Sequence, residues 1–192
     1  MYNENNSNDT KWDGFSDPST SYLGEILKKD GFNFNPNNFK IKIGFINKSD
    51  NKDPIYEHEG DSGFDIRANL KGIIGLESVR LKPLERKLIP TGLYFELPES
   101  YELQVRPRSG LALNHGITVL NTPATIDQAY VGEVKVILIN LGSEDFVINH
   151  GDRIAQGVVS PRLSTEMGYL ISVDKIDPTS RNDGGFGSTG VK

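Results

Sequence analysis

An arginine beside a short capped segment is the first feature of the sequence that suits phosphate chemistry. In the stretch from Arg106 to Gly116, Ser109 is a good helix N-cap and Gly116 a good residue to end a helix. The first amides of a helix have no internal partner and form a ready anion site, to which Arg108 adds a positive charge. Most capped helix starts bind only water, so this feature alone is a weak indication.

The glycine-rich tail of residues 181–190 is the second such feature. It interrupts its glycines with one arginine, one aromatic residue and two hydroxyl residues. A tail this rich in glycine is ordinarily just a mobile chain end. Its other side chains, however, are the groups needed to hold a phosphate and to stack on a base. Such a tail can close over a ligand, exclude water and then open for release.

The third feature is the segment from Asn121 to Glu133, which lies between two strand-like runs and is predicted to form a long hairpin. Asn121 can offer both a donor and an acceptor to a base edge, and Tyr130 a flat wall nearby. Asp127 is a carboxylate in a β context. A single aspartate in a loop is most often only a solvated turn residue, and at this point that alternative stays open.

Five segments taken together resemble the five ordered motifs of the homotrimeric dUTP pyrophosphatases, a family of enzymes. In chain order they are Asp61–Asp65, Pro107–Gly110, Asn121–Glu133, Gly151–Gln156 and Arg181–Gly190. The resemblance spans the chain from about Phe39 to Lys192. Five motifs in the right order and spacing are far more specific than any one of them alone.

The resemblance implies an all-β fold, a jelly roll or distorted β-barrel with one short helix, assembled as a homotrimer. Each active site would take motifs from all three chains, and the tail of one chain would close a site built by its neighbours. The implied reaction is hydrolysis of dUTP to dUMP and diphosphate, with water attacking the α-phosphorus and Mg²⁺ bridging phosphate oxygens. This reaction limits uracil incorporation into DNA and supplies dUMP for thymidylate synthesis.

The family roles are carried onto the matching residues of this chain. Asp127 would hold and deprotonate the attacking water, and Asp65 would orient metal-bound water. Tyr130 would pack beneath the deoxyribose and leave no room for a 2′-hydroxyl. Uracil would be read by Asn121 and by the hairpin around Thr125 and Ile126. The phosphates would be held by Arg108, Ser109, Gly110 and Gln156. From the tail, the substrate-binding residues would be Arg181 and Ser188 at the γ-phosphate, Phe186 over uracil, and Gly187.

Two positions depart from the family pattern. The hairpin motif commonly has glycine where this chain has Ala124, and a Cβ there is strained only if the turn needs a positive φ. The tail motif often begins Arg-Gly, whereas here Asn182 follows Arg181, and asparagine is among the residues that best tolerate the left-handed region. Neither position carries a group assigned to catalysis.

The composition limits the function classes. The 192 residues suffice for one domain, and the absence of cysteine excludes disulfides and thiolate metal sites. The net charge is −5, with no basic run longer than Lys28-Lys29, which argues against a general nucleic-acid binder. No stretch approaches the roughly 20 apolar residues that cross a bilayer, and no secretory signal follows Met1. We therefore expect an intracellular, cytoplasmic protein without membrane contact.

The elements that must position these motifs are predicted to be short strands. Apolar residues alternate with polar ones from Phe39 to Phe45, the period of a half-buried strand. Glycine, proline, asparagine and aspartate separate the further apolar runs, which are Val79–Leu81, Leu88–Leu97, Leu103–Val105, Thr118–Leu120, Val134–Ile139, Phe146–Ile148 and Ile154–Val159. This pattern by itself predicts a sandwich, barrel or jelly roll.

The chain is expected to divide into three parts. Residues 1–38 form a polar, flexible extension, residues 39–175 the catalytic jelly roll, and residues 176–192 the tail that closes a neighbouring active site. Within the extension, Asp17-Pro18 can begin a short helix that ends near Gly31. That helix could dock on the trimer or on another protein. The alternative is a frayed segment that touches nothing.

Two other functions compete with dUTP hydrolysis. A dCTP deaminase, or a deaminase–hydrolase hybrid, would share the fold but needs a general acid/base, usually a glutamate of the hairpin region, beside C4 of the base. A binding module would use the fold, with the extension as its contact, to recognise a protein partner. Intact motifs favour the hydrolase, and binding would then be an added role.

Overall fold

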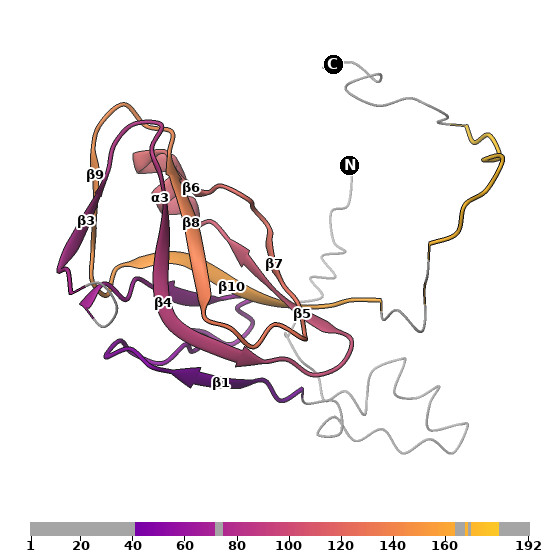
Figure 1. The fold of residues 1–192 in the computed structure, drawn as a ribbon, viewed down its shortest axis with the longest axis horizontal. Coiled ribbons are helices and arrows are strands. Elements are labelled where there is room, and N and C mark those ends of the chain that lie inside the picture. The colour runs from indigo at the N-terminus through magenta and orange to yellow at the C-terminus, as the bar shows by residue number, and fades with distance from the viewer. Residues whose placement is uncertain (1–40, 72–74, 164–167, 169, 181–192) are drawn as a thin grey trace, which may run out of the picture. The chain divides into compact units, whose positions relative to one another are not determined.

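The computed structural model describes residues 41–71, 75–163, 168 and 170–180 (Figure 1). Strands dominate this part of the chain, accompanied by the short helix α3 (Ser109–His115). The strands are β1 (Gly44–Asn47), β2 (Phe64–Arg67), β3 (Ser78–Leu81), β4 (Arg86–Glu96), β5 (Tyr101–Arg106), β6 (Ile117–Val119), β7 (Ala124–Ile126), β8 (Val134–Asn140), β9 (Phe146–Asn149) and β10 (Arg153–Pro161). The prediction of an all-β fold with one short helix is confirmed.

The strands form two four-stranded sheets and one two-stranded sheet. The first has the order β1-β4-β8-β6, the second β2-β10-β5-β7, and β3 pairs with β9. The described ladders are antiparallel. Strand neighbours are often distant in sequence, which brings the separate motifs together. By its contacts the chain divides into Met1–Gly44 and Phe45–Lys192, and all strands except the first residue of β1, Gly44, belong to the second unit.

Alternating apolar residues build the core. In β8, Val134, Val136 and Leu138 are buried while the intervening side chains are more exposed, as the period of two requires. Ile66 of β2 and Leu103 of β5 are fully buried as well. Truncating a buried leucine of this kind to alanine typically costs about 2–5 kcal/mol. This packing holds the strands that carry the motifs.

The helix α3 begins one residue earlier than predicted. Its N-cap is Arg108, with φ −92° and ψ 129°, rather than Ser109. The reason is that the Arg108 carbonyl already accepts the first helical bond, from the Ala112 N–H at 3.1 Å. No side chain caps this end. The predicted helix end is confirmed, because Gly116 adopts φ 67° and donates its N–H to Ala112.

No helix among the described residues is long and apolar enough to cross a membrane.

Candidate active site

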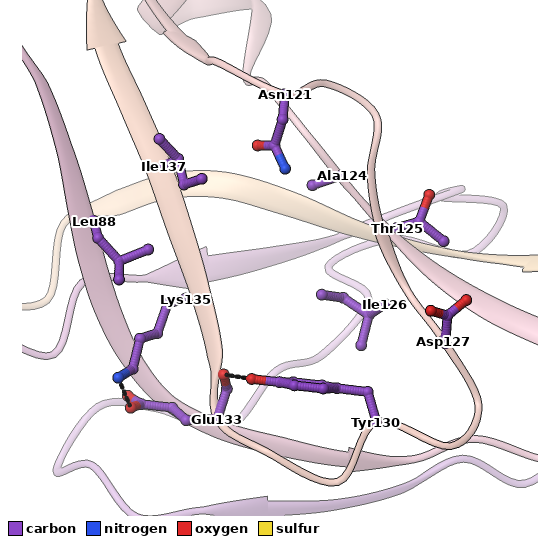
Figure 2. Close-up of a pocket in the computed structure, with 10 residues that line it drawn as sticks. All are labelled: Leu88, Asn121, Ala124, Thr125, Ile126, Asp127, Tyr130, Glu133, Lys135 and Ile137. Carbon is purple, nitrogen blue, oxygen red and sulfur yellow. Dashed lines mark hydrogen bonds and ion pairs between the residues drawn. The ribbon is translucent and has the colours of Figure 1, made fainter.

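A pocket of about 340 Å³ lies against the segment between β6 and β8 (Figure 2). The residues that line it, hereafter the hairpin pocket, are Leu88, Asn121, Ala124, Thr125, Ile126, Asp127, Tyr130, Glu133, Lys135 and Ile137. The hairpin residues that the sequence assigned to uracil, deoxyribose and the attacking water are all among them, namely Asn121, Thr125, Ile126, Asp127 and Tyr130. Their grouping around one cavity was expected from the hairpin motif.

Strand pairing and one tight turn give the hairpin its course. Residues 124–126 form β7 and pair with β5, where Ile126 lies opposite Leu103. The chain then turns at once, since the Tyr130 N–H donates to the Asp127 carbonyl at 3.0 Å. Asp127 is exposed directly after the end of β7, and Tyr130 lies three residues later on the same turn. A carboxylate and an aromatic ring are thereby held on one wall of the pocket.

Ala124 fits the hairpin without backbone strain. Among the described residues, the non-glycine positions with positive φ are Leu84 and Ser100, so Ala124 does not require a left-handed conformation. It lies in β7 opposite Val105. The departure from glycine at this position therefore carries no conformational penalty, and Ala124 adds its methyl group to the pocket lining.

A second group of side chains, hereafter the arginine cluster, consists of Asp65, Arg108 and Arg153. The Asp65 Oδ1 forms an ion pair with the Arg108 Nε at 3.1 Å, and the Asp65 Oδ2 accepts a hydrogen bond from the Arg153 Nη1 at 3.1 Å. The Arg108 Nη1 also donates to the Arg153 carbonyl at 3.0 Å. The Asp65 side chain is only 20% exposed, and each of its two oxygens is paired with a different guanidinium group.

Strand β10 brings the fourth motif to this cluster. It pairs with β2 and with β5, so that Gln156 lies opposite Asp65 on one side and opposite Arg106 on the other. The Gln156 side chain donates to the Pro107 carbonyl at 2.9 Å. A pocket of about 230 Å³ lies here, lined by Glu57, Asp61, Ser62, Gly63, Phe64, Asp65 and Gln156. The first, second and fourth motifs therefore meet in the folded chain.

Comparison with known proteins decides the family. The dUTPase family model matches residues 49–190. A relative from Wolinella succinogenes, named deoxyuridine 5′-triphosphate nucleotidohydrolase, is 58% identical over 137 residues, covering 71% of this chain and 85% of its own. The chain belongs to the dUTPase family. A relative of the same name from Finegoldia magna is 47% identical over 150 residues, which cover 78% of this chain and 99% of its own.

Solved dUTPase structures share the fold. A mutant dUTPase of Staphylococcus bacteriophage 80alpha, solved with dUpNHpp, gives a TM-score of 0.64 at 24% identity, covering 78% of this chain and 99% of the other. A mutant dUTPase of phage phi11, whose description concerns a structural Mg(II) ion, gives 0.60 at 21% identity, with coverages of 71% and 99%. The dUTPase-like jelly roll predicted from the motifs is thus confirmed.

The remaining predicted site residues divide into two groups. Ser109 and Gly110 are exposed in the first turn of α3, next to Arg108. The tail residues lie outside the described part of the chain; they are Arg181, Phe186, Gly187 and Ser188. The jelly roll therefore carries the predicted site residues of the hairpin and of the first, second and fourth motifs, and the tail carries the rest.

The described residues suit a magnesium ion that is reached through water. They contain no group of three or more His, Asp or Glu side chains that could enclose a metal. Asp65 is the carboxylate expected to meet the ion, and both of its oxygens are already paired with arginines. Mg²⁺ retains several waters and commonly binds through substrate phosphates with few carboxylates. This donor set fits an outer contact from Asp65.

Two residues of the site carried no sequence assignment. Arg153 lies within the fourth motif, but only the folded chain shows that it shares Asp65 with Arg108. Glu133 ends the third motif, and its carboxylate accepts the backbone N–H of Thr91 at 3.2 Å and of Gly92 at 2.9 Å. A glutamate directly before the buried Val134 was the available signal, because carboxylates are rarely buried without partners.

Proposed function

We propose that the hairpin pocket holds the deoxyuridine part of dUTP and that Asp127 activates the water that attacks the α-phosphorus. The chain is a dUTP nucleotidohydrolase, which converts dUTP to dUMP and diphosphate. The observation that supports this use of the pocket most strongly is that Asn121, Asp127 and Tyr130 line the same cavity. These are the groups required for the base, the reacting water and the sugar.

Uracil selection follows from hydrogen bonding in a confined space. Asn121 and the backbone near Thr125 and Ile126 would read the carbonyl and imide edge of the base. Cytosine would present its amino group to donors meant for a carbonyl and leave buried groups unpaired, a mismatch that costs on the order of several kcal/mol. Thymine would be excluded by its additional methyl group.

Deoxyribose selection is assigned to Tyr130. Its hydroxyl donates to the Glu133 carbonyl at 2.9 Å, and its ring extends toward Glu133 in Figure 2. A ring fixed in this way can pack against the face of the sugar. An added 2′-hydroxyl would then collide with the ring, so UTP would be rejected by shape.

The phosphates are assigned to the second and fourth motifs and to the tail. Arg108, with the first turn of α3 at Ser109 and Gly110, offers positive charge and N–H donors, and Gln156 lies on the neighbouring strand β10. Arg181 and Ser188 would complete this set from another chain of a homotrimer. When bound, Mg²⁺ would neutralise phosphate charge and polarise the α-phosphate, while Asp65 orients water near it.

Asp127 is the residue assigned to the chemical step. Its exposed carboxylate can accept a proton from a water aligned with the α-phosphorus, and it can also accept a hydrogen bond from the sugar 3′-hydroxyl. Holding one water in line, with donors already aimed at the phosphates, is the main source of acceleration in such reactions. The proton stays on Asp127 until the products leave.

A nucleotide panel tests this proposal. Diphosphate release should be fast with dUTP and far slower with dCTP, dTTP and UTP, and it should require Mg²⁺. The deaminase alternative would instead release ammonia from dCTP. The only glutamate of the hairpin pocket, Glu133, has its carboxylate bonded to Thr91, Gly92 and Lys135, which argues against its use as an acid/base at C4.

The role of residues 1–38 stays a prediction, since they lie outside the described residues. We propose that this extension contacts a protein partner as an added role. Deleting it should abolish capture of that partner and leave dUTP hydrolysis unchanged. Hydrolysis that falls together with capture would instead assign the extension to the enzyme.

A further inference from the structure

The strand β4 contains an irregularity that is hydrogen-bonded to Glu133 of the hairpin pocket. Its pairing with β8 shifts between Pro90 and Leu93, so Thr91 and Gly92 leave the regular ladder. Gly92 adopts φ 72°, and Thr91 is buried. Backbone N–H groups at such a bulge lose their ladder partners, and a buried N–H without a partner is costly. Something other than β8 must therefore accept these two hydrogens.

Glu133 supplies the missing acceptor. Its Oε1 receives the N–H of Thr91 at 3.2 Å and of Gly92 at 2.9 Å, and its Oε2 pairs with the Lys135 Nζ at 3.4 Å. The Glu133 side chain is only 10% exposed, so these bonds are largely shielded from water. Charge-assisted bonds from backbone N–H groups are stronger than neutral ones. One carboxylate thereby fastens the start of β8 to the bulge of β4.

The same residue also holds the ring of Tyr130. The Glu133 carbonyl accepts the Tyr130 hydroxyl at 2.9 Å, and the Tyr130 N–H bonds to the Asp127 carbonyl at 3.0 Å. Glu133 is therefore bonded to the β4 bulge through its carboxylate and to Tyr130 through its carbonyl, and Tyr130 is bonded in turn to Asp127 through its backbone N–H. These contacts connect the sugar wall and the catalytic carboxylate to the rigid sheet.

Gly132 leaves the space that this arrangement needs. A Cβ placed on Gly132 would lie 2.7 Å from both the Cζ and the hydroxyl oxygen of Tyr130, closer than side-chain atoms pack. Because the hydroxyl is bonded to Glu133, the ring cannot move aside without losing that bond. Glycine at position 132 thus leaves room for the Tyr130 ring, and the Glu133 carbonyl holds the ring by a hydrogen bond.

We propose that Glu133 is a positioning residue for the dUTPase reaction: by bonding the β4 bulge it fixes Tyr130 and the Asp127 turn, and so sets the preference for deoxyribose. This inference rests on the proposed function of the hairpin pocket. Glu133 does not touch the reacting atoms in this account. Glu133 acts through Tyr130. Loss of the Glu133 carboxylate should therefore change the selectivity between dUTP and UTP in a protein that still folds.

The test compares kcat and KM for dUTP and UTP in the full-length wild type, Glu133→Ala, Glu133→Gln and Gly132→Ala. Glu133→Ala should lower the kcat/KM ratio of dUTP over UTP on the order of tenfold, mainly through a higher KM for dUTP. Glu133→Gln keeps an acceptor oxygen for Thr91 and Gly92 and should restore most of the ratio. Gly132→Ala should lower the ratio in the same direction.

Glu85→Ala provides the matched control. The Glu85 carboxylate also accepts a backbone N–H, from Lys82 at 2.8 Å, and pairs with Lys87 at 3.1 Å, but it does not line the hairpin pocket. Removing it should shift the thermal unfolding midpoint without changing the dUTP/UTP ratio. A purely structural role of Glu133 would produce that same pattern, with a lower midpoint and an unchanged ratio.

The outcomes separate this inference from the function on which it rests. An unchanged ratio in both Glu133→Ala and Gly132→Ala, with a relaxed ratio in Tyr130→Ala, overturns the positioning role and leaves the proposed function standing. A wild type that hydrolyses UTP as well as dUTP rejects the proposed function itself. Should Glu133→Ala fail to fold, Gly132→Ala decides alone: a lowered ratio supports the proposal, and a wild-type ratio overturns it.

Discussion

The hairpin pocket and the arginine cluster are built in opposite ways. All lining residues of the pocket except Leu88 come from one stretch, residues 121–137, so the local course of the chain sets their geometry. The cluster joins Asp65 of β2, Arg108 before α3 and Arg153 of β10, which only the sheet order brings together. Under the proposed function, selection of base and sugar would therefore depend on the local chain, and charge placement at the phosphates on the whole fold.

The two regions also differ in how their carboxylates are used. Asp127 in the hairpin pocket is exposed and can meet water, whereas Asp65 in the arginine cluster is 20% exposed and bonded to two guanidinium groups. An exposed carboxylate can exchange protons with a ligand. A doubly paired one serves better as a fixed charge that orients its surroundings. We therefore assign the chemical step to Asp127 and the positioning of neighbouring groups to Asp65.

The largest expected effect is that of Asp127→Asn. The amide cannot take the proton of the attacking water, so kcat should fall on the order of 10²–10⁴-fold, the usual contribution of a general base. Affinity for a non-hydrolysable dUTP analogue, measured by calorimetry, should stay near that of the wild type. Turnover at the wild-type rate would remove the distinction between the two carboxylates.

Tyr130→Ala should have the next largest effect. Loss of the ring opens space for a 2′-hydroxyl, and the kcat/KM preference for dUTP over UTP should fall on the order of tenfold or more. The dependence of activity on Mg²⁺ concentration should not change, because we assign the contact with the metal ion to Asp65 of the arginine cluster. Steady-state kinetics with both nucleotides decides the point. Retained selectivity would show that the sugar is read elsewhere.

Asp65→Asn is the matched change in the arginine cluster and should act more weakly on kcat than Asp127→Asn. It removes the charge shared by Arg108 and Arg153 and the carboxylate that orients metal-bound water. We expect the Mg²⁺ concentration for half-maximal activity to rise several-fold, about 1 kcal/mol in binding free energy. Selectivity between dUTP and UTP should stay as in the wild type, and a change in selectivity would mean that the two regions are not separable.

The smallest expected effect lies outside both regions, at Glu85. The Lys82 N–H and then the Lys87 ammonium hold the pKa of the Glu85 carboxyl below its usual value of 4.5. Because the folded-state pKa is the lower one, the stabilisation is present above pH 4.5 and disappears as the pH falls through the folded-state pKa. Glu85→Gln should thus lower the unfolding midpoint slightly near neutral pH, and the difference from the wild type should shrink as the pH falls below 4.5. A difference that stays constant as the pH falls would reject this explanation, and dUTP turnover should not change at all.

The contrast between the two regions explains what the sequence could predict. Asn121, Asp127 and Tyr130 could be placed together because they lie on one hairpin, and apolar runs such as that of β8 predicted most of the strands. The runs did not predict β2 or β7, and the strand expected from Phe39 to Phe45 was placed too early, because β1 begins at Gly44. The link between Arg153 and Asp65 could not be predicted, since it depends on the pairing of β10 with β2. The proposed role of Glu133 could not be predicted either, because it depends on a bulge in β4 that has no recognisable pattern in the local sequence.

The start of α3 shows a limit of another kind. Ser109 has the better capping side chain, yet Arg108 is the residue that precedes the first helical turn. Its side chain is held at Asp65 and its carbonyl accepts the Ala112 N–H, so tertiary contacts accompany a helix start that local preference did not select.

A crystal structure of the enzyme with Mg²⁺ and a non-hydrolysable dUTP analogue is the decisive experiment for the catalytic role of Asp127. We expect uracil and deoxyribose in the hairpin pocket of one protomer, and phosphates against Arg108 and Ser109 of an adjoining one. A water should lie within about 2.6–3.2 Å of the Asp127 carboxylate, in line with the α-phosphorus. An Asp127 carboxylate remote from that phosphorus in every site of the assembly would reject its role in catalysis.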